Sequence, residues 1–284
     1  MKWRDGRRST NVEDRRGSRA APRLLGGGIG TIVLVLVAMY FGIDPTPLLQ
    51  GVQSGSVSSA GTRPTAEDLK DDPLADRVAV VVGYTEDVWT EIFAEQGRRY
   101  QAPTLVLFTG ATQSSCGLGQ AAMGPFYCPA DQKAYIDLSF YDQMRTRFRA
   151  PGDFAQAYVI AHEIGHHVQN LLGISGQVHQ MKQRVGQAEA NALSVRLELQ
   201  ADCLAGVWAA RADQASDILE QGDVEEALNA ASAIGDDTLQ RRSRGTVVPE
   251  SFTHGTSAQR QHWFRKGLSS GDPDACDTFS VETV

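Results

Sequence analysis

Apolar residues recur at helical spacing between residues 74 and 92, directly after an Asp-Pro pair. Asp72 suits the N-cap of a helix, Pro73 suits its first turn, and Gly97 is typical of a helix end. Residues 78–82 taken alone would also fit a strand, but the longer period favours a helix. The folded part of the chain is therefore predicted to start near residue 71.

Shorter β-type runs and further helical patterns follow. Three strands are predicted, at residues 104–109, 126–128 and 134–138. N-cap residues are predicted at Ser139, Asp153, Asp223 and Thr256. With helical spacing they predict helices at residues 139–149, 154–172, 188–212, 223–234 and 256–268. This order of elements predicts an α+β fold, with helices around a small β-sheet.

The residues from Leu24 to Ile43 carry no charge and, as a helix, would span roughly 30 Å, the thickness of a bilayer core. They predict one transmembrane helix. Residues 1–23 hold eight basic and three acidic side chains, and no basic residue follows the apolar run closely. The positive-inside rule therefore predicts a cytoplasmic N-terminus and an extracytoplasmic remainder at the cell membrane.

A cleaved signal peptide is the alternative for this apolar run. Small residues do not follow it at a suitable distance, which favours an uncleaved signal-anchor. Residues 44–70 are rich in Pro, Gly and Ser and predict a flexible linker. The chain is thus predicted to contain a basic cytoplasmic tail (1–23), a transmembrane helix (24–43), a linker (44–70) and an exported domain (71–284).

The composition of the 284 residues is that of a globular protein, with 42% hydrophobic and 21% charged residues. The net charge of −7 argues against nucleic acid as a partner, because phosphate binding needs a concentrated positive surface. The chain has no C-x-x-C pair, no phosphate-binding Gly loop and no G-x-S-x-G elbow. The missing C-x-x-C pair excludes a structural zinc finger. The other two absences leave no motif for phosphate binding or for a serine nucleophile.

The predicted helix at residues 154–172 contains H-E-x-x-H at His162, Glu163 and His166. On a helix the two His lie one turn apart on one face, about 6 Å along the axis, so both imidazoles can bind one Zn²⁺. Glu163 is rotated away from that face and can accept a proton from water as a general base. An exposed polar helix face is the alternative, but the apolar residues around the motif indicate core packing.

A catalytic zinc site needs a third protein ligand and one open position. The extended metzincin pattern would need Gly and His where this chain has Gln169 and Leu172, so that class is excluded. Glu198 is the preferred third ligand, because Asp202 follows one turn later and could accept the free ring N–H of a ligating His. A solvated acidic helix face is the alternative interpretation of this pair.

Three motifs together, HEIGHH at residues 162–167, ELQADCLAG at 198–206 and THGTSAQR at 253–260, resemble the bacterial neutral zinc metallopeptidase family. The resemblance covers most of residues 71–280, and the tail and apolar run as well. H-E-x-x-H with E-x-x-x-D is also similar to the gluzincin arrangement of thermolysin-like enzymes. The resemblance implies a zincin-like metallopeptidase domain that hydrolyses peptide bonds, and it supplies no substrate.

His254 stands just before a predicted helix start, where it could donate to the oxyanion of a tetrahedral intermediate. A surface histidine in a turn is the alternative. Tyr135 could serve similarly, but its strand is a better candidate for pairing with extended substrate, as an edge strand does in zincin-like folds. His167 points away from the ligand face and is predicted to be structural or exposed.

Four cysteines in an exported domain are expected to form disulfides. Cys116 and Cys128 flank a Gly-rich loop and are the preferred pair. Cys203 and Cys276 would then form the second pair, and a buried free thiol at Cys203 is the alternative.

The sequence thus predicts a membrane-anchored zinc metallopeptidase that acts on a peptide or protein substrate. His162, His166 and Glu198 would hold Zn²⁺, and Glu163 would activate water. Asp202 would orient a ligand, and His254 would stabilise the oxyanion. The rival hypothesis is a non-catalytic, membrane-anchored zinc-binding scaffold or interaction protein, which a fourth protein ligand closing the site would favour.

Overall fold

The computed structural model describes residues 1–16, 69 and 71–284 of the chain. A four-stranded sheet with strand order β1-β2-β6-β5 lies at the centre of these residues. Its strands are β1 (Val12–Asp14), β2 (Thr104–Phe108), β5 (Phe126–Cys128) and β6 (Lys133–Asp137). Strands β1, β2 and β6 are parallel, and β5 is an antiparallel edge strand beside β6. A separate hairpin follows β2 and consists of β3 (Ala111–Ser114) and β4 (Gly117–Gln120).

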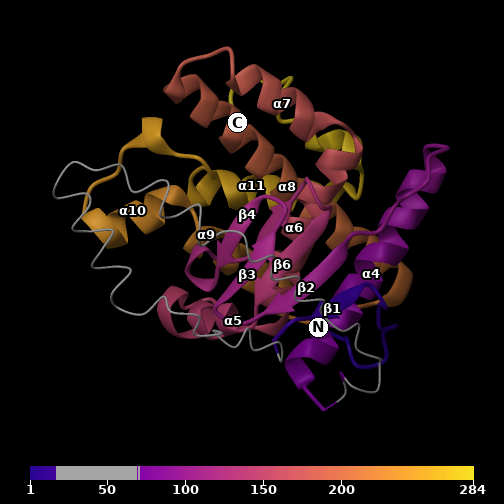
Figure 1. Cartoon of the computed structure of the whole chain (residues 1–284). Helices are drawn as coiled ribbons and strands as arrows, with labels where there is room; N and C mark the ends of the chain where they lie inside the picture. The colour runs from indigo at the N-terminus through magenta and orange to yellow at the C-terminus, as the bar shows by residue number, and fades with distance from the viewer. Residues whose placement is uncertain (17–68, 70) are drawn as a thin grey trace, which may run out of the picture. The chain divides into compact units, whose positions relative to one another are not determined.

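Helices surround this sheet, as the predicted α+β fold requires (Figure 1). The described residues contain the helices α4 (Pro73–Glu95), α5 (Ser139–Gln143), α6 (Asp153–Leu171), α7 (Ile174–Lys182), α8 (Gln187–Ser216), α9 (Asp223–Ala233), α10 (Asp236–Arg244) and α11 (Ser257–Ser270). Each predicted helix and strand is present with its ends shifted by a few residues. Strands β1, β3 and β4 and helices α7 and α10 have no counterpart in the predicted pattern.

The helix caps follow the sequence in two cases and differ in three. The predicted N-caps of α4 and α11 are present, and α11 carries a complete capping box. Ser139, Asp153 and Asp223, however, are the first residues of α5, α6 and α9 rather than their N-caps. Asp153 and Asp223 have a different partner, because their carboxylates accept hydrogen bonds from the α-amino group of Met1.

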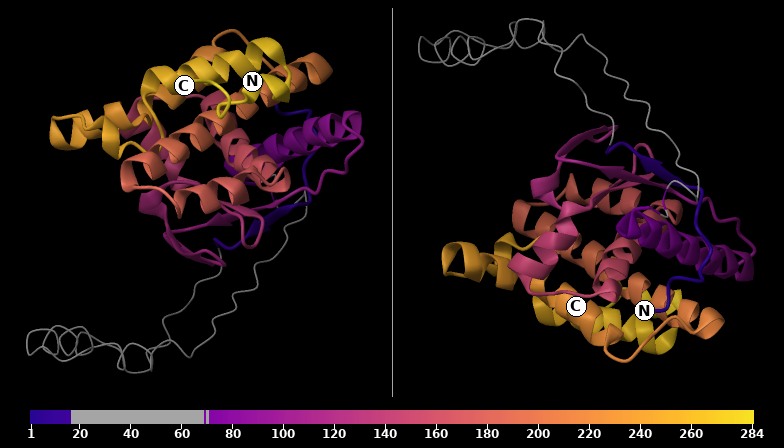
Figure 2. Two further views of the ribbon diagram at one scale, coloured as in Figure 1. Left: turned by 90° about the horizontal axis from the view of Figure 1, so that it is seen from above. Right: turned by 90° about the horizontal axis from the view of Figure 1, so that it is seen from below.

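Helix α6 lies between the sheet and the C-terminal helices and packs against β5, β6, α8 and α9 (Figure 2). Gly165 lets α6 approach α8 closely, since a Cβ atom there would lie 3.0 Å from the carbonyl oxygen of Ala201. Gly206 of α8 and Gly267 of α11 likewise leave no space for a side chain where those two helices cross. These close approaches bring side chains of α6, α8 and α11 together.

Residues 1–14 belong to the same compact unit as the C-terminal domain, which corrects the predicted division of the chain. Strand β1 pairs with β2, and its Val12 is only 1% exposed. The amide of Ser9 also donates to the carbonyl of Ala79 in α4. The prediction of a basic tail separate from the domain is therefore wrong for residues 1–14.

The charges of residues 1–14 explain why the sequence suggests a solvated tail. Arg8 forms a two-bond ion pair with Asp76, and Arg7 bonds to Glu86. The α-ammonium group of Met1 lies at the start of α6, where it contacts the carboxylates of Asp153 at 2.7 Å, Glu220 at 3.0 Å and Asp223 at 3.3 Å. Cations that look like a positive run in the sequence thus pair with acidic side chains of the domain.

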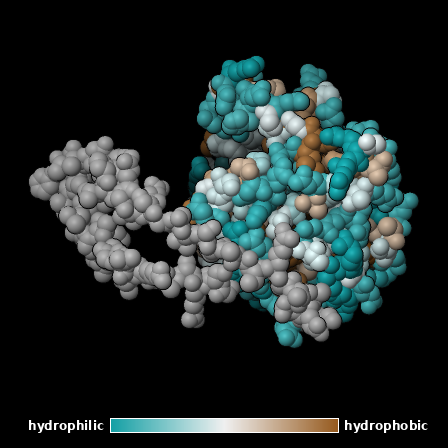
Figure 3. All heavy atoms as spheres, turned by 45° about the vertical axis from the view of Figure 1, so that its right-hand side comes forward, coloured by the Kyte–Doolittle hydropathy of each residue, from teal (hydrophilic) through white to brown (hydrophobic). Residues whose placement is uncertain are grey.

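Among the described residues, no helix combines the length and the apolar character that a membrane crossing needs. The predicted transmembrane helix at residues 24–43 lies outside the described residues, as does nearly all of the predicted linker at 44–70. The face of the described domain drawn in Figure 3 is mostly hydrophilic, with small hydrophobic patches.

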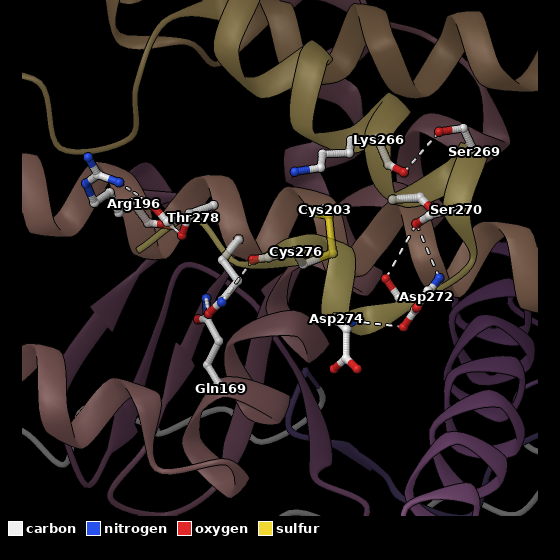
Figure 4. The surroundings of a disulfide bond; sticks show 12 residues. Gln169, Arg196, Cys203, Lys266, Ser269, Ser270, Asp272, Asp274, Cys276 and Thr278 are labelled. Atoms are coloured by element: carbon white, nitrogen blue, oxygen red, sulfur yellow. Dashed lines mark hydrogen bonds between the residues drawn. A yellow bond between two sulfur atoms is a disulfide. The ribbon is translucent and has the colours of Figure 1, made fainter. Parts of the chain in front are cut away.

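Both predicted disulfides are present. Cys116, in the turn between β3 and β4, is bonded to Cys128 of β5. Cys203 of α8 is bonded to Cys276, which ends the short 3-10 helix η4 (Pro273–Cys276) (Figure 4). All four cysteines are therefore paired, and the alternative of a free thiol at Cys203 is wrong.

Candidate metal centre

Helix α6 presents His162 and His166 on one face, one turn apart. Their rings lie edge to face, with centroids 4.8 Å apart. The opposite side of the helix is buried in the core through Ala161, Ile164 and Val168. Because that packing fixes the helix, the two imidazoles face the same space.

Helix α8 brings the carboxylate of Glu198 to these two imidazoles. Its Oε2 lies 3.2 Å from Nε2 of His162, and its Oε1 lies 3.4 Å from Nε2 of His166. Ligand atoms roughly 2.0–2.1 Å from a tetrahedral zinc ion lie about 3.3 Å from one another. The donor types and their spacing therefore fit zinc, and the described residues add no fourth protein ligand to this group.

Asp202, one turn after Glu198 on α8, contacts the ring nitrogen of His162 that faces away from Glu198. Its Oδ1 lies 2.8 Å from Nδ1 of His162 and also accepts a hydrogen bond from the Tyr158 hydroxyl at 2.5 Å. Arg260 of α11 donates to both carboxylate oxygens of Asp202, at 2.8 and 2.9 Å. With Asp202 accepting from Nδ1, Nε2 is the nitrogen of His162 that can bind a metal.

The Nδ1 atom of His166 has a neutral hydrogen-bond partner, whereas that of His162 has a carboxylate. Its Nδ1 lies 2.9 Å from Oε1 of Gln169, which is one turn later on α6 and fully buried. The Gln169 amide nitrogen donates to the carbonyl of Leu197 and to Oε1 of Gln200, both on α8. Both histidines therefore turn Nδ1 toward an acceptor and Nε2 toward Glu198.

The carboxylates of the site favour positive charge on the neighbouring imidazoles. Burial favours the protonated form of Glu198, but His166 and His162 outweigh burial and hold the pKa of its carboxyl well below its usual value. Burial would also lower the pKa of His162, but Asp202 and Glu198 raise it to about 10. A divalent cation would supply the positive charge that these carboxylates otherwise draw from imidazole protons.

The candidate ligands line a cleft of about 1050 Å³. Glu163 lines the same cleft and is not one of the three grouped ligand residues. Burial raises the pKa of Glu163, although the neighbouring histidines oppose this effect. Strand β5 contributes Phe126 and Tyr127 to the cleft wall. The edge strand and the candidate ligands thus face one space.

His254 lies in the loop before α11 and also lines this cleft. Asp236, the first residue of α10, fixes the loop, because its Oδ2 accepts hydrogen bonds from the backbone N–H groups of residues 253, 254 and 255. Its Oδ1 lies 3.3 Å from Nδ1 of His254. This hydrogen bond raises the pKa of His254, while burial acts in the opposite direction.

Comparison with known proteins agrees with this geometry. A family model described as "Putative neutral zinc metallopeptidase" matches residues 1–279. The chain belongs to the neutral zinc metallopeptidase family. The match includes residues 1–14 as well as the residues that line the cleft.

Relatives of this chain occur in Escherichia coli and in Mycobacterium tuberculosis. The chain is 52% identical over 288 residues to "Uncharacterized protein YpfJ" of Escherichia coli K12, covering 98% of this chain and 99% of that protein. It is 42% identical over 215 residues to "Uncharacterized protein Rv2575" of Mycobacterium tuberculosis H37Rv, covering 72% of this chain and 70% of that protein. No solved structure matches the chain.

Two residues that the sequence analysis considered, Tyr135 and His167, do not join the candidate ligands. The hydroxyl of Tyr135 donates to Asp131, and its ring stacks on Phe126. Its strand, β6, lies between β2 and β5, so the prediction that this strand is a free edge for substrate is wrong, and β5 is the edge strand instead. His167 is fully buried, where Nε2–H donates to the carbonyl of Gln101 and Nδ1 accepts from the hydroxyl of Tyr127. His167 is therefore structural, as one of its two predicted roles states.

Sequence reasoning missed four polar residues that support the metal centre. Tyr158 precedes His162 by one helical turn, and Gln169 follows His166 within one turn, so helical spacing could have marked both. Arg260 closes the THGTSAQR motif, which marks its neighbourhood but not its partner Asp202. Asp236 has no sequence signal, because it contacts His254 only through the fold.

Proposed function

We propose that this protein is a zinc-dependent metallopeptidase that hydrolyses peptide bonds. The proposal is carried by the group of His162, His166 and Glu198 on the wall of a large cleft, with Glu163 beside it. A three-ligand site leaves one position open for water, which is typical of catalytic rather than structural zinc. The cleft has room for a peptide segment.

Zinc, when bound, would supply a Lewis acid that lowers the pKa of water in the site toward about 7. Glu163 would then accept a proton from that water and later deliver it to the leaving amine. Glu163 lines the cleft without belonging to the ligand group, which suits this role. Asp202 and Gln169 would keep the Nδ1 protons of the histidines turned away from the ion.

Other residues that line the cleft could bind the substrate's scissile carbonyl and backbone. His254, which Asp236 contacts, would donate a hydrogen bond to the carbonyl oxygen as negative charge develops on it. Within the described residues, edge strand β5 has a strand partner on one side only, so an extended peptide could pair with its other side. Such pairing uses main-chain bonds and tolerates many side-chain sequences.

We further propose that the enzyme acts outside the cytoplasm and is attached to the membrane through the apolar run at residues 24–43. Two disulfides in one domain support an oxidising compartment. Because β1 pairs with β2, residues 1–14 and the domain lie on the same side of any membrane in this fold. We therefore propose that the N-terminus lies on the same side of the membrane as the domain. The cytoplasmic N-terminus expected from the sequence is not part of this proposal.

The decisive test compares Glu163→Gln with the matched surface variant Glu225→Gln, which is exposed on α9. Zinc content is measured by elemental analysis, and cleavage of a labelled unfolded protein is followed with product mapping by mass spectrometry. We expect about one zinc per chain in all three proteins, and cleavage by the wild type and Glu225→Gln only. Equal cleavage by Glu163→Gln, or no zinc in any of them, would refute the proposal.

A further inference from the structure

A chain of three hydrogen bonds leads from His166 to Cys276 in the C-terminal segment, which we define as residues 271–284. Nδ1 of His166 lies 2.9 Å from Oε1 of Gln169, and Nε2 of Gln169 lies 3.1 Å from Oε1 of Gln200. Nε2 of Gln200 lies 3.0 Å from the carbonyl oxygen of Cys276. We call these two glutamines the amide relay. It joins a candidate metal ligand to a disulfide-bonded residue.

Backbone carbonyls fix the direction of every bond in the amide relay. The carbonyl of Cys276 can only accept, so Gln200 must turn its NH₂ group toward it and its oxygen toward Gln169. Gln169 must then turn its NH₂ group toward Gln200, and the carbonyl of Leu197 imposes the same orientation at 2.7 Å. The oxygen of Gln169 therefore faces His166, and Nδ1 of that ring must be the donor.

Burial keeps the amide relay in this arrangement. Gln169 is fully buried and Gln200 is 7% exposed, so water does not offer alternative partners to either amide. A buried amide that turned around would place two donors or two acceptors face to face and lose its hydrogen bonds. With Nδ1 fixed as the donor, Nε2 is the ring nitrogen of His166 that faces Glu198 and can serve as a ligand.

The far end of the relay is fixed by the attachment of the C-terminal segment to α8 (Figure 4). Cys203 holds Cys276 covalently, and Arg196 donates to the carbonyls of Thr278 and Val281. Arg196, Gln200 and Cys203 are spaced about one helical turn apart, so they present one face of α8 to the segment. The disulfide therefore lies beside the last acceptor of the relay.

We propose that Gln169 is a positioning residue for His166, and that the Cys203–Cys276 disulfide supports this role through Gln200. This inference rests on the proposed zinc site. The acceptor at Nδ1 sets the tautomer and orientation of a ligating histidine, so its loss weakens metal affinity by about 10- to 100-fold. The relay does so without adding a charge, whereas His162 depends on the carboxylate of Asp202.

The first test measures zinc affinity by chelator competition in Gln169→Met, whose side chain has similar length but cannot accept from His166. The matched control is Gln240→Met, which removes a buried amide that bonds to Ser251 and Val248 instead. We expect zinc affinity about 10- to 100-fold weaker in Gln169→Met and unchanged in the control. The spectrum of the cobalt-substituted protein should change in Gln169→Met alone.

Two other outcomes separate the hypotheses. If the wild type binds zinc tightly and a folded Gln169→Met protein binds it equally well, the positioning role is refuted while the proposed function stands. If the wild type itself binds no zinc, the proposed function fails. Gln200→Met, which leaves the direct contact between His166 and Gln169 in place, should weaken zinc binding by a smaller factor, and it provides the test should Gln169→Met not fold.

The role of the disulfide is tested in a Cys116→Ser/Cys128→Ser protein, where a phosphine reductant can open only the Cys203–Cys276 bond. We expect reduction to weaken zinc affinity in this protein. The same reduction in a protein that also carries Gln200→Met should cause no additional loss, because the connection to Gln169 is already broken. Zinc affinity that is insensitive to reduction in the first protein would refute the coupling to the disulfide.

Discussion

Arg260 places its Nε 2.8 Å from Oδ2 of Asp202, and both side chains are almost completely buried, with exposed fractions of 2% and 0%. The residues are far apart in the sequence and lie on α11 and α8. Close packing of these helices at Gly206 and Gly267 makes the contact possible. The ion pair thus links the packing of the C-terminal helices to the orientation of His162, which shares the same carboxylate.

Removal of the guanidinium should therefore destabilise the whole domain. Arg260→Met removes one of the two cationic groups that contact the buried carboxylate of Asp202, the other being His162, and we expect a loss of up to about 3–5 kcal/mol in the free energy of unfolding of the metal-free protein. Urea unfolding of Arg260→Met, Asp202→Asn and the double variant measures this energy. The double variant should lose much less than the sum of the single losses. Additive losses would show that the two side chains do not interact.

His254→Ala should reduce turnover while leaving zinc in place. A preorganised donor to the developing oxyanion contributes about 10²- to 10³-fold to kcat, and His254 is not among the three candidate ligands. Steady-state kinetics with parallel zinc analysis provides the measurement. A variant that keeps wild-type kcat would remove His254 from the mechanism.

Asp236→Asn should change the pH dependence of the same reaction. The hydrogen bond from Asp236 raises the pKa of His254, so it keeps the imidazole protonated to higher pH. Activity that needs the protonated ring is present below this raised pKa and is lost as the pH rises through it. In Asp236→Asn the alkaline limb of kcat/KM should therefore move to lower pH. An unmoved limb would mean that the protonation of His254 does not control it.

His167 should make the domain less stable in weak acid. Burial lowers the pKa of its imidazole to about 4, against an ordinary value of about 6.5, although the bond to the Gln101 carbonyl opposes this shift. Between these pH values the unfolded chain binds a proton that the folded protein refuses, so stability falls as the pH decreases, by about 1.4 kcal/mol per pH unit.

The variant His167→Gln provides the comparison, because other titrating groups are common to both proteins. From pH 6.5 to pH 4 the wild type should lose about 3 kcal/mol more than the variant in the free energy of unfolding. Urea unfolding at several pH values gives both curves. Parallel curves would indicate that His167 titrates normally in the folded protein.

The position of the N-terminus can be tested in membrane-bound protein. Arg4 and Ser269 are exposed, at opposite ends of the chain. Arg4→Cys and Ser269→Cys are each treated with a membrane-impermeant maleimide in sealed vesicles of one orientation and after lysis. Because residues 1–14 form part of the domain, both cysteines should react, or both should be protected, in sealed vesicles. Labelling of only one would contradict the pairing of β1 with β2.

The sequence was sufficient to predict which side chains share a helix face at the candidate metal centre. His162 and His166 share a face because of their spacing, and Glu198 and Asp202 do so on a second helix. The capping box at Thr256 located the start of α11. These features are local, so one turn of helix is enough to place each pair.

Other contacts depend on the packing of distant elements and leave no local pattern. Arg260 looks like an exposed basic residue on a helix until α11 is packed against α8. Gln169 likewise looks like an ordinary polar residue on a helix. Its acceptors lie on α8, which is separated from α6 in the sequence by helix α7. Residues 1–14 were misleading for a related reason, since their charges appear unpaired until the carboxylates of α4 lie beside them.

Strand β1 also sets an order of events during folding. Residues 12–14 are synthesised early, but their partners at residues 105–107 follow much later, and this parallel pairing must close a long loop. Until the loop closes, β2 has an uncovered edge, and such an edge can pair with a second chain. Residues 12–14 precede the rest of the sheet in the chain but are expected to complete it late, and their pairing covers the edge through which partly folded chains could associate.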